Sequence, residues 1–313
     1  MPIGVVTQPQ GILAWMTKSL AIVGTGRVGS ALGRRLRETG WQITVVAARS
    51  ENSAKRGAHF IGGGRPAAGI PGTLAVASTI LLTVPDDAIA LAATELARNA
   101  GETLCGKVVL HTSGALDASV LEPVRSRGAA VGSMHPLQSF NGVSVPPLEG
   151  KVFAIEGDEL AVRVARRIAR SLGGIPVGIA AAKKPLYHAA GAFAAGLSLA
   201  MEEAGVRILM SAGLKRREAQ KALLSLTRQV LEHYEKLGPQ KAWTGPLARG
   251  DFGVVASHER ALSELRPEFL EAYRAVSRLS ARVLAYDPAA VLRELDMISG
   301  NVKLVAKAER GYE

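Results

Sequence analysis

Six residues near the start of the chain have the types and spacing of a phosphate-binding turn. Gly24-Thr25-Gly26-Arg27-Val28-Gly29 follows an apolar run at 20–23 and leads into a stretch with helical spacing at 30–38. In that order, Gly24 allows the tight turn, Gly26 admits a pyrophosphate, and Gly29 lets the helix pack against the strand. The free N–H groups at the helix start would face the phosphates. The pattern predicts a dinucleotide site, and the alternative is a purely structural turn.

The residues after the second expected strand favour NADP over NAD. NAD-specific sites usually carry an acid there, which binds the ribose 2′-hydroxyl. Here the strand is followed by Arg49-Ser50, and no acid occurs before Glu51. Arg49 can pair with a 2′-phosphate and Ser50 can donate a hydrogen bond, while Lys55 or Arg56 could add charge. The alternative is that Arg49 is a surface arginine at a strand end.

Two later strand ends should lie beside the same cofactor. In Val84-Pro85-Asp86-Asp87 we expect the first three residues near the cofactor, although both aspartates are first of all expected to cap the next helix. In His111-Thr112-Ser113-Gly114, His111 and Ser113 are further cofactor candidates. Ser113 could bond the nicotinamide amide or the substrate. The alternative for this segment is a helix-entry turn.

Candidates for proton transfer occur at two further places. Lys184 and His188 are four residues apart, so they share one face of a continuous helix, and Pro185 fits its first turn. A histidine titrates near neutral pH, which suits a proton donor. His135 precedes Pro136, which favours an extended backbone, and with Gln138 it could line the same cleft. The alternatives are a buried structural histidine at 188 or 135 and a surface lysine at 184.

An arginine in the second half of the chain could hold the substrate. In Thr244–Asp251, turn formation and helix capping explain Gly245-Pro246 and Asp251, but not Arg249. Its guanidinium could anchor a substrate carboxylate. The six histidines show no metal-ligand spacing, so no metal site is expected.

The elements that must position these residues follow an α/β pattern and then a helical one. Strands are expected at 20–24, 42–47, 79–84, 107–111, 130–134, 151–155 and 175–179, with helices between most of them, notably at 30–38, 86–98, 119–127 and 159–172, and a loop at 62–72. This alternation predicts a Rossmann-type, mostly parallel sheet. Helices are then expected at 185–211, 216–237, 252–261, 267–285 and 288–295. We therefore predict a cofactor domain at 16–181, a helical substrate and dimerisation domain at 182–313, and a cleft at the carboxyl ends of the strands.

Composition narrows the class of protein. The chain has 313 residues, 48% of them hydrophobic, and a formal net charge of +11. The single cysteine excludes an internal disulfide framework and fits a reducing cytoplasm. The basic residues are scattered and no nucleic-acid motif occurs, so we expect no nucleic-acid partner and no membrane span. Residues 1–15 are uncharged, and we expect an extended start site before Met16 or a disordered arm.

Several strings together resemble one bacterial family of oxidoreductases with a Rossmann-like N-terminal domain and a C-terminal helical domain of unknown function. They are Val84–Asp87, His111–Gly114, Ser133–Phe140, Tyr187–Ala190 and Thr244–Asp251, in that order. The family is similar to pyrroline-5-carboxylate reductases, ketopantoate reductases and deazaflavin-dependent NADP reductases, an arrangement like that of 6-phosphogluconate dehydrogenase. One departure is Ala195-Gly196, where the family often has Ser-Asn.

The resemblance implies NADPH chemistry without fixing the substrate. Related hydroxyacid dehydrogenases carry a Lys-x-x-x-Asn pair at the place of Lys184 and His188. We expect a homodimeric reductase of a small anionic carbonyl compound, such as a ketopantoate-like keto acid. A pyrroline-5-carboxylate-type imine reductase and a non-catalytic NADP-binding regulator are the alternatives, because a fold does not establish a function.

Overall fold

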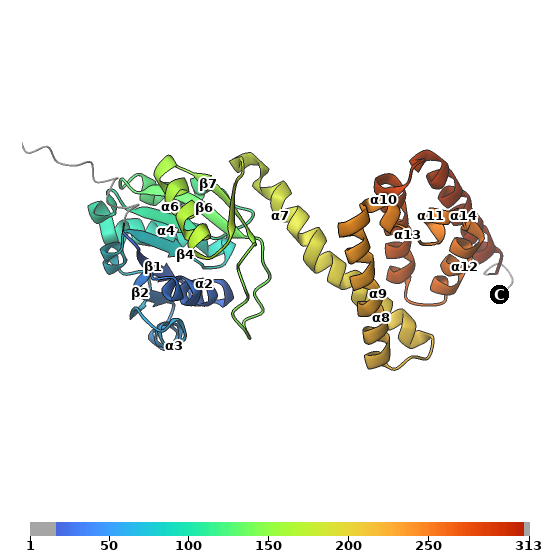
Figure 1. The fold of residues 1–313 in the computed structure, drawn as a ribbon, viewed down its shortest axis with the longest axis horizontal. Helices are drawn as coiled ribbons and strands as arrows, with labels where there is room; N and C mark the ends of the chain where they lie inside the picture. The colour runs from blue at the N-terminus through green and yellow to red at the C-terminus, as the bar shows by residue number, and fades with distance from the viewer. Residues whose placement is uncertain (1–16, 310–313) are drawn as a thin grey trace, which may run out of the picture. The chain divides into compact units, whose positions relative to one another are not determined.

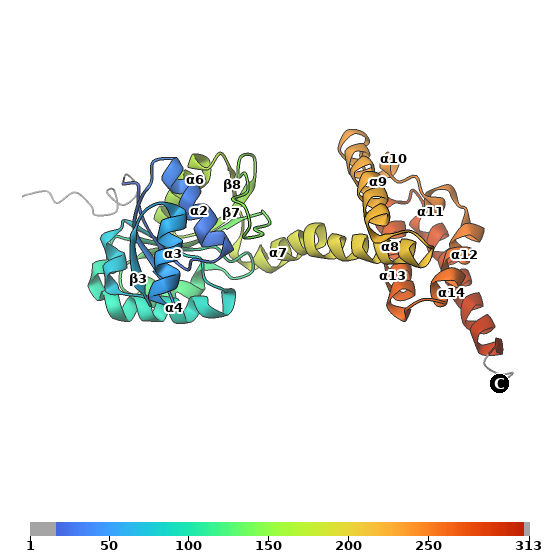
Figure 2. The same cartoon turned by 90° about the horizontal axis from the view of Figure 1, so that it is seen from below.

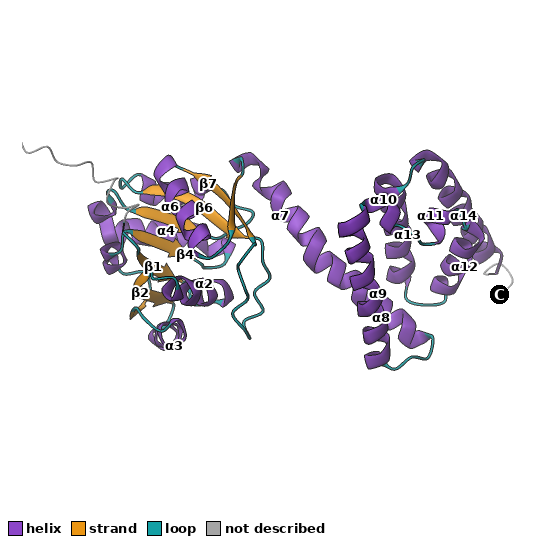
Figure 3. Cartoon of the chain, in the orientation of Figure 1, coloured by secondary structure: helices purple, strands orange, loops and turns teal. Residues whose placement is uncertain are grey.

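A computed structural model describes residues 17–309, with side chains to residue 300. The chain divides between Ala195 and Gly196 into two compact units, which are described separately below. The first unit is an α/β domain and the second is helical (Figure 3). The expected extension at 1–15 lies outside the described residues. No helix among those described is long and apolar enough to cross a membrane.

The first unit is built on an eight-stranded sheet in the order β3-β2-β1-β4-β5-β6-β7-β8 (Figure 1). All neighbouring strands are parallel except β6 and β7. The strands are β1 Ser19–Val23, β2 Gln42–Ala48, β3 Arg65–Ala68, β4 Thr79–Leu82, β5 Val108–His111, β6 Ala130–Pro136, β7 Val152–Gly157 and β8 Ile175–Gly178. The first six follow the doubly wound order that places ligands at the carboxyl ends of the strands.

Helices cover both faces of this sheet (Figure 2). They are α2 Arg27–Glu38, α3 Glu51–Ile61, α4 Asp86–Ala100, the short α5 Glu122–Arg125 and α6 Glu159–Ser171. The helix α7, Lys184–Ala192, follows β8 and extends away from the sheet (Figure 1). Alternate residues of β1 point to opposite layers: Ile22 packs with α2 and α6, and Ala21 packs with α4. Both layers are almost entirely aliphatic, as the few aromatic residues require.

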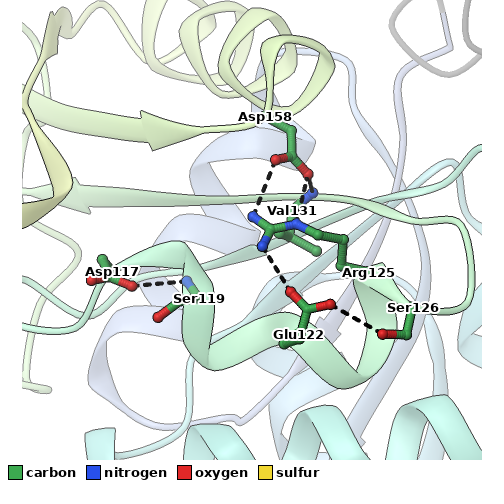
Figure 4. Close-up of polar contacts among 7 residues, drawn as sticks. All are labelled: Asp117, Ser119, Glu122, Arg125, Ser126, Val131 and Asp158. Atoms are coloured by element: carbon green, nitrogen blue, oxygen red, sulfur yellow. Dashed lines mark hydrogen bonds and ion pairs between the residues drawn. The ribbon is translucent and has the colours of Figure 1, made fainter.

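The corner between α5 and α6 is held by a partly exposed network of carboxylates around Arg125 (Figure 4). Asp158 accepts hydrogen bonds from the Val131 amide at 2.8 Å and from Arg125 at 3.1 Å and 3.3 Å. Arg125 also pairs with Glu122 on its own helix at 2.9 Å. These contacts fix the entry into α6 against the start of β6.

The second unit consists of helices only in its described residues. They are α8 Ser198–Ser211, α9 Arg216–Leu237, α10 Pro239–Ala242, α11 Pro246–Arg249, α12 Phe252–Ser263, α13 Pro267–Leu284 and α14 Pro288–Glu309. A small core contains Val255, Ala281, Leu295 and Ile298. Beside it, the buried Glu259 accepts hydrogen bonds from Arg274.

The predicted fold class is confirmed, with two local corrections. The expected loop at 62–72 contains β3, which extends the sheet beyond β2. The expected helix 185–211 is interrupted by a π-helical turn at Phe193–Leu197. The α/β unit extends to residue 195 and includes α7, whose first residue, Lys184, is buried in that unit. The domain boundary expected after residue 181 stays a prediction.

Candidate functional site

The glycine turn forms as the sequence predicts, and two of its three glycines, Gly24 and Gly29, have no room for a side chain. Gly24 has a φ of 101°, which favours glycine. A Cβ on Gly29 would lie 2.1 Å from the Gly24 carbonyl oxygen and 2.2 Å from Thr83 Oγ1, whereas one on Gly26 would meet nothing within 4 Å. Close packing therefore requires Gly29, and Gly26 leaves an open backbone surface at the start of α2.

A cavity of about 640 Å³ opens beside this turn. Its lining comes from the turn, from α3 and from the loop at 141–145, and includes Thr25, Gly26, Arg27, Ser53, Arg56 and Asn141. Arg56 donates a hydrogen bond to Ser53 Oγ at 3.1 Å, and Ser53 lies 3.0 Å from Ser50 Oγ. Two guanidinium groups and the start of a helix thus border one hollow, which suits an anionic ligand.

The structure distinguishes among the basic residues predicted near this cavity. Arg56 lines it, and Lys55 instead pairs with Glu51 at 2.7 Å. Arg49 is exposed at the end of β2, and Ser50 caps α3 by accepting a hydrogen bond from the Ser53 amide. The loop at 141–145 was not predicted as part of the site, because nothing in its sequence marks contact with a turn more than 100 residues earlier.

A second cluster lies where β4, β5 and β6 end. Ser113 Oγ donates a hydrogen bond to Asp86 Oδ2 at 2.7 Å, and the Ser113 amide donates to His111 Nδ1 at 3.2 Å. Asp86 and Asp87 were expected as caps, but Pro85 occupies the cap position and neither aspartate makes a capping bond. Asp86 instead fixes the loop that follows β5.

The Lys184 side chain is completely buried at the start of α7. Its ammonium donates hydrogen bonds to the Ser113 carbonyl oxygen at 2.9 Å and to Ser133 Oγ on β6. Burial lowers the pKa of Lys184, while Glu156, Asp117 and Asp86 raise it. The alternative of a surface lysine is therefore wrong. Through these two hydrogen bonds the buried ammonium ties the start of α7 to the loop after β5 and to β6.

Three ring side chains lie close together near Lys184: His135 on β6, and Tyr187 and His188 on α7. The Tyr187 hydroxyl lies 3.0 Å from His135 Nδ1, and the rings of His135 and His188 are 5.9 Å apart, edge to face. A Cβ on Gly114 would lie 2.7 Å from His188 Cδ2 and 2.9 Å from His135 Nε2. His188 is exposed, so the predicted alternative of a buried histidine there is wrong.

Burial and charge keep two histidines neutral. Burial and the Lys184 charge lower the pKa of both His111 and His135 to about 4. His111 is fully buried, and its Nε2 lies 3.1 Å from the Asp117 carbonyl oxygen. Both its ring nitrogens have partners within the fold, so this arrangement offers no direct contact between His111 and a cofactor. Burial also raises the pKa of Tyr187 to about 12.

Two predicted substrate-binding residues make local contacts. Gln138 donates a hydrogen bond to the Ser139 carbonyl oxygen at 3.1 Å. Arg249, in the second unit, contacts Asp251 at 2.7 Å and donates to the Thr244 carbonyl oxygen at 2.6 Å, so it closes its own loop. Their substrate roles stay predictions.

No group of histidine, cysteine and acidic side chains in the described part of the chain could hold a metal ion.

Sequence reasoning missed Tyr187 and Ser133 as site residues. Tyr187 is three positions after Lys184, which places the two on neighbouring faces of one helix. Ser133 stands two positions before His135 on β6, so both point to the same face of the strand. Both spacings can be read from the sequence. Only the fold shows that β6 and α7 place these residues in one cluster.

Comparisons with known protein families match the two halves of the chain separately. Residues 8–136 match a Rossmann-like domain, and residues 151–280 match a domain of unknown function, DUF2520. A comparison with functionally curated proteins finds no match.

Solved structures share the fold at low sequence identity. A proposed NADP oxidoreductase from Bacteroides fragilis has a TM-score of 0.69 and 22% identity, over 85% of this chain and 98% of its own. A reductive aminase from Aspergillus terreus, solved with NADPH and ethyl-5-oxohexanoate, has a TM-score of 0.65 and 19% identity, over 85% and 94%. Pyrroline carboxylate reductase from Plasmodium falciparum, solved with NADP, has a TM-score of 0.54 and 15% identity, over 82% and 95%.

The low pKa of His111 predicts a loss of stability in acid. Above pH 6.5 the imidazole is neutral whether the chain is folded or unfolded, but between pH 6.5 and about 4 the unfolded chain binds the proton more readily. Stability should therefore fall by roughly 2–3 kcal/mol through this histidine as the pH drops across that window. His111→Asn should be less stable at pH 7 and show a shallower fall. Urea unfolding at pH 7 and pH 4.5 measures both, and parallel curves for the two proteins would disprove the assignment.

Proposed function

We propose that this chain, a Rossmann-like domain followed by a DUF2520 domain, is an NADPH-dependent oxidoreductase that reduces a C=O or C=N bond of a small anionic substrate. One observation carries the proposal. A phosphate-binding turn with its cavity and a cluster of proton-bearing side chains lie along the same edge of one sheet, at the carboxyl ends of its strands.

The fit to a dinucleotide rests on the turn itself. The absence of a side chain at Gly26 leaves room for a pyrophosphate, and the first N–H groups of α2 face that space. Arg27 would hold pyrophosphate charge, and Arg49, Ser50 and Arg56 are candidates for the 2′-phosphate. NADPH, when bound, supplies the hydride.

Burial and exposure divide the proton chemistry between His135 and His188. His135 stays neutral at pH 7, so it can donate or accept a hydrogen bond to orient the substrate but does not carry a spare proton. His188 is exposed, next to His135, and we assign it the donation of a proton to the developing oxyanion or amine. The hydrogen bond from Ser113 to Asp86 fixes the loop after β5, which lies against both histidines.

Lys184 acts in this scheme through position rather than by contact with substrate. Its ammonium has no exposed surface and is bound to Ser113 and Ser133, so it can fix the start of α7 and hence Tyr187 and His188. The same charge lowers the pKa of His135. Removing it would disturb both the geometry and the protonation state of the site.

The substrate class has two candidates. A ketopantoate-like keto acid is the first, and a cyclic imine acid is the second, which is favoured by the fold shared with a reductive aminase and a pyrroline carboxylate reductase. Arg249 is our candidate for the substrate carboxylate, once released from Asp251. NADPH oxidation across a matched panel of keto acids and cyclic imines tests the proposal. A protein that binds NADPH but oxidises it with neither class would instead be a regulator.

The helical unit supports assembly into a homodimer. In the 22-residue helix α9 only Ala219 is buried, while Leu226, Leu231 and Tyr234 are 56%, 60% and 57% exposed. Such a face is usually covered by another surface, and a symmetric dimer is the commonest solution.

The cofactor assignment predicts a preference for NADPH that depends on named arginines. Arg56→Ala and Arg49→Ala should each weaken NADPH about 10- to 100-fold and NADH much less, because a charge-assisted contact to the 2′-phosphate is lost. Lys55→Ala is the matched control, since Lys55 pairs with Glu51 outside the cavity. Calorimetric titration of both cofactors measures the ratio. An equal loss for both cofactors, or tighter NADH binding by the unaltered chain, would refute the assignment.

The proton-donor assignment predicts a defect in turnover at His188. His188→Ala should lower kcat by about 100-fold or more on the substrate that the panel identifies, with NADPH affinity nearly unchanged. His233→Ala, on α9, is the control for loss of a histidine. Arg249→Ala should mainly raise KM, because it removes binding shared by the ground and transition states. Near-normal kcat in His188→Ala would move the assignment to His135 or Ser113.

The dimer prediction is tested by light scattering at micromolar concentration. The measured mass should be about twice the 32.8 kDa of one chain. Leu226→Glu and Leu231→Glu together place charge on the exposed face of α9 and should shift the mass toward the monomer, whereas Leu91→Glu, at an exposed position on α4, should not. A single mass near 32.8 kDa for the unaltered chain would contradict the prediction.

A further inference from the structure

The outer face of α6 gathers arginines that the cofactor site does not use. Arg163, Arg166, Arg167 and Arg170 line one hollow of about 560 Å³ together with Lys18 and Ser171. The opposite face of the helix is apolar and buried against the sheet, so the arginines all project to one side. Five basic side chains therefore lie around this one hollow.

The grouping is unfavourable for the helix by itself. Arg163 and Arg167, and likewise Arg166 and Arg170, are four residues apart, and like charges at this spacing destabilise a helix. The helix dipole favours Arg170 in the last turn but not Arg163 or Arg166. Glu159 pairs with Arg163, and no described acid forms an ion pair with Arg166 or Arg170. A bound anion would relieve the remaining repulsion.

The base of the hollow is built from ordered contacts. Arg167 is half-buried, with its guanidinium 5.8 Å from the Trp41 ring centre. Trp41 donates a hydrogen bond from Nε1 to Ser171 Oγ at 3.0 Å, and Ser171 in turn donates to the carbonyl oxygens of Arg167 and Ile168 at 2.9 Å. These contacts hold one arginine in place, and the exposed Arg166 and Arg170 stand beside it.

This hollow is separate from the cofactor cavity. Lys18 directly precedes β1, whereas the glycine turn directly follows it, and the five residues of the strand span about 16 Å. The two cavities share no lining residue. A ligand in the arginine hollow would therefore bind independently of the dinucleotide.

We propose that the arginine hollow on α6 binds a small molecule that carries two or more phosphate groups. Guanidinium groups pair with phosphate oxygens in two-point contacts, and Arg163 to Arg170 span about 10 Å of helix, enough for several phosphates. The volume is that of a small-molecule site. A nucleic acid is disfavoured because Trp41, the aromatic residue at the hollow, is buried and cannot stack on a base.

Tripolyphosphate is the probe that tests this site. In calorimetric titration at about 50 mM salt, the full chain should bind one tripolyphosphate with a Kd of roughly 10–100 μM, with and without saturating NADPH. Arg166→Gln with Arg170→Gln should weaken binding at least tenfold. Arg98→Gln with Arg127→Gln removes the same charge from other exposed positions and should change the Kd less than twofold. Unchanged melting temperatures confirm that both variants fold.

Four results would overturn the proposal. They are the absence of binding up to about 1 mM, equal weakening by the two double variants, displacement of tripolyphosphate by NADPH, and tighter binding of a 20-nucleotide single strand that depends on the same two arginines. The first result would mean that the hollow binds no polyphosphate, and the second that the anion is attracted only by diffuse surface charge. The third would place the anion in the cofactor cavity, and the last would make the hollow a nucleic-acid surface. Failure of NADPH to bind would contradict the proposed function without affecting this one.

Discussion

The buried ammonium of Lys184 is the interaction on which the candidate site depends. It joins the loop after β5, through the Ser113 carbonyl, to β6, through Ser133, at the first turn of α7. Truncating it would leave these acceptors unpaired inside the protein, which is costly. Because α7 carries Tyr187 and His188, the lysine also decides where those side chains stand relative to His135.

The same charge gives the site its electrostatic character. Lys184 lowers the pKa of His111 and His135, in addition to the effect of burial, and so keeps both histidines neutral. The third histidine of the site, His188, is exposed. Glu156, whose pKa is raised by burial, lies behind the lysine and offsets part of its charge. A neutral His135 beside a high-pKa Tyr187 suits hydrogen bonding at constant protonation across the neutral range.

The local elements of the fold were predictable because they depend on short-range patterns. The glycine turn, the doubly wound sheet and the bounds of α9 follow from apolar spacing and turn residues. The strand β3 was not predicted, because Gly and Pro residues around it signal a loop and only pairing with β2 makes it a strand. Most residues of the candidate site were predicted one by one, but Tyr187 and Ser133 were missed and the arrangement was not predicted. Nothing in the sequence shows that Lys184 is buried, that His111 faces inward, or that Arg249 bonds to its own loop.

The most direct test is to locate the nicotinamide in the complex of the full chain with NADP⁺. With histidines labelled in an otherwise deuterated protein, nuclear Overhauser effects can be measured between the nicotinamide ring protons and the histidine ring protons. Our account predicts contacts from the nicotinamide to His135 or His188, and their loss in Lys184→Met, in which α7 is no longer tied to the sheet edge. A saturated complex without such contacts, or with contacts that persist in Lys184→Met, would contradict it.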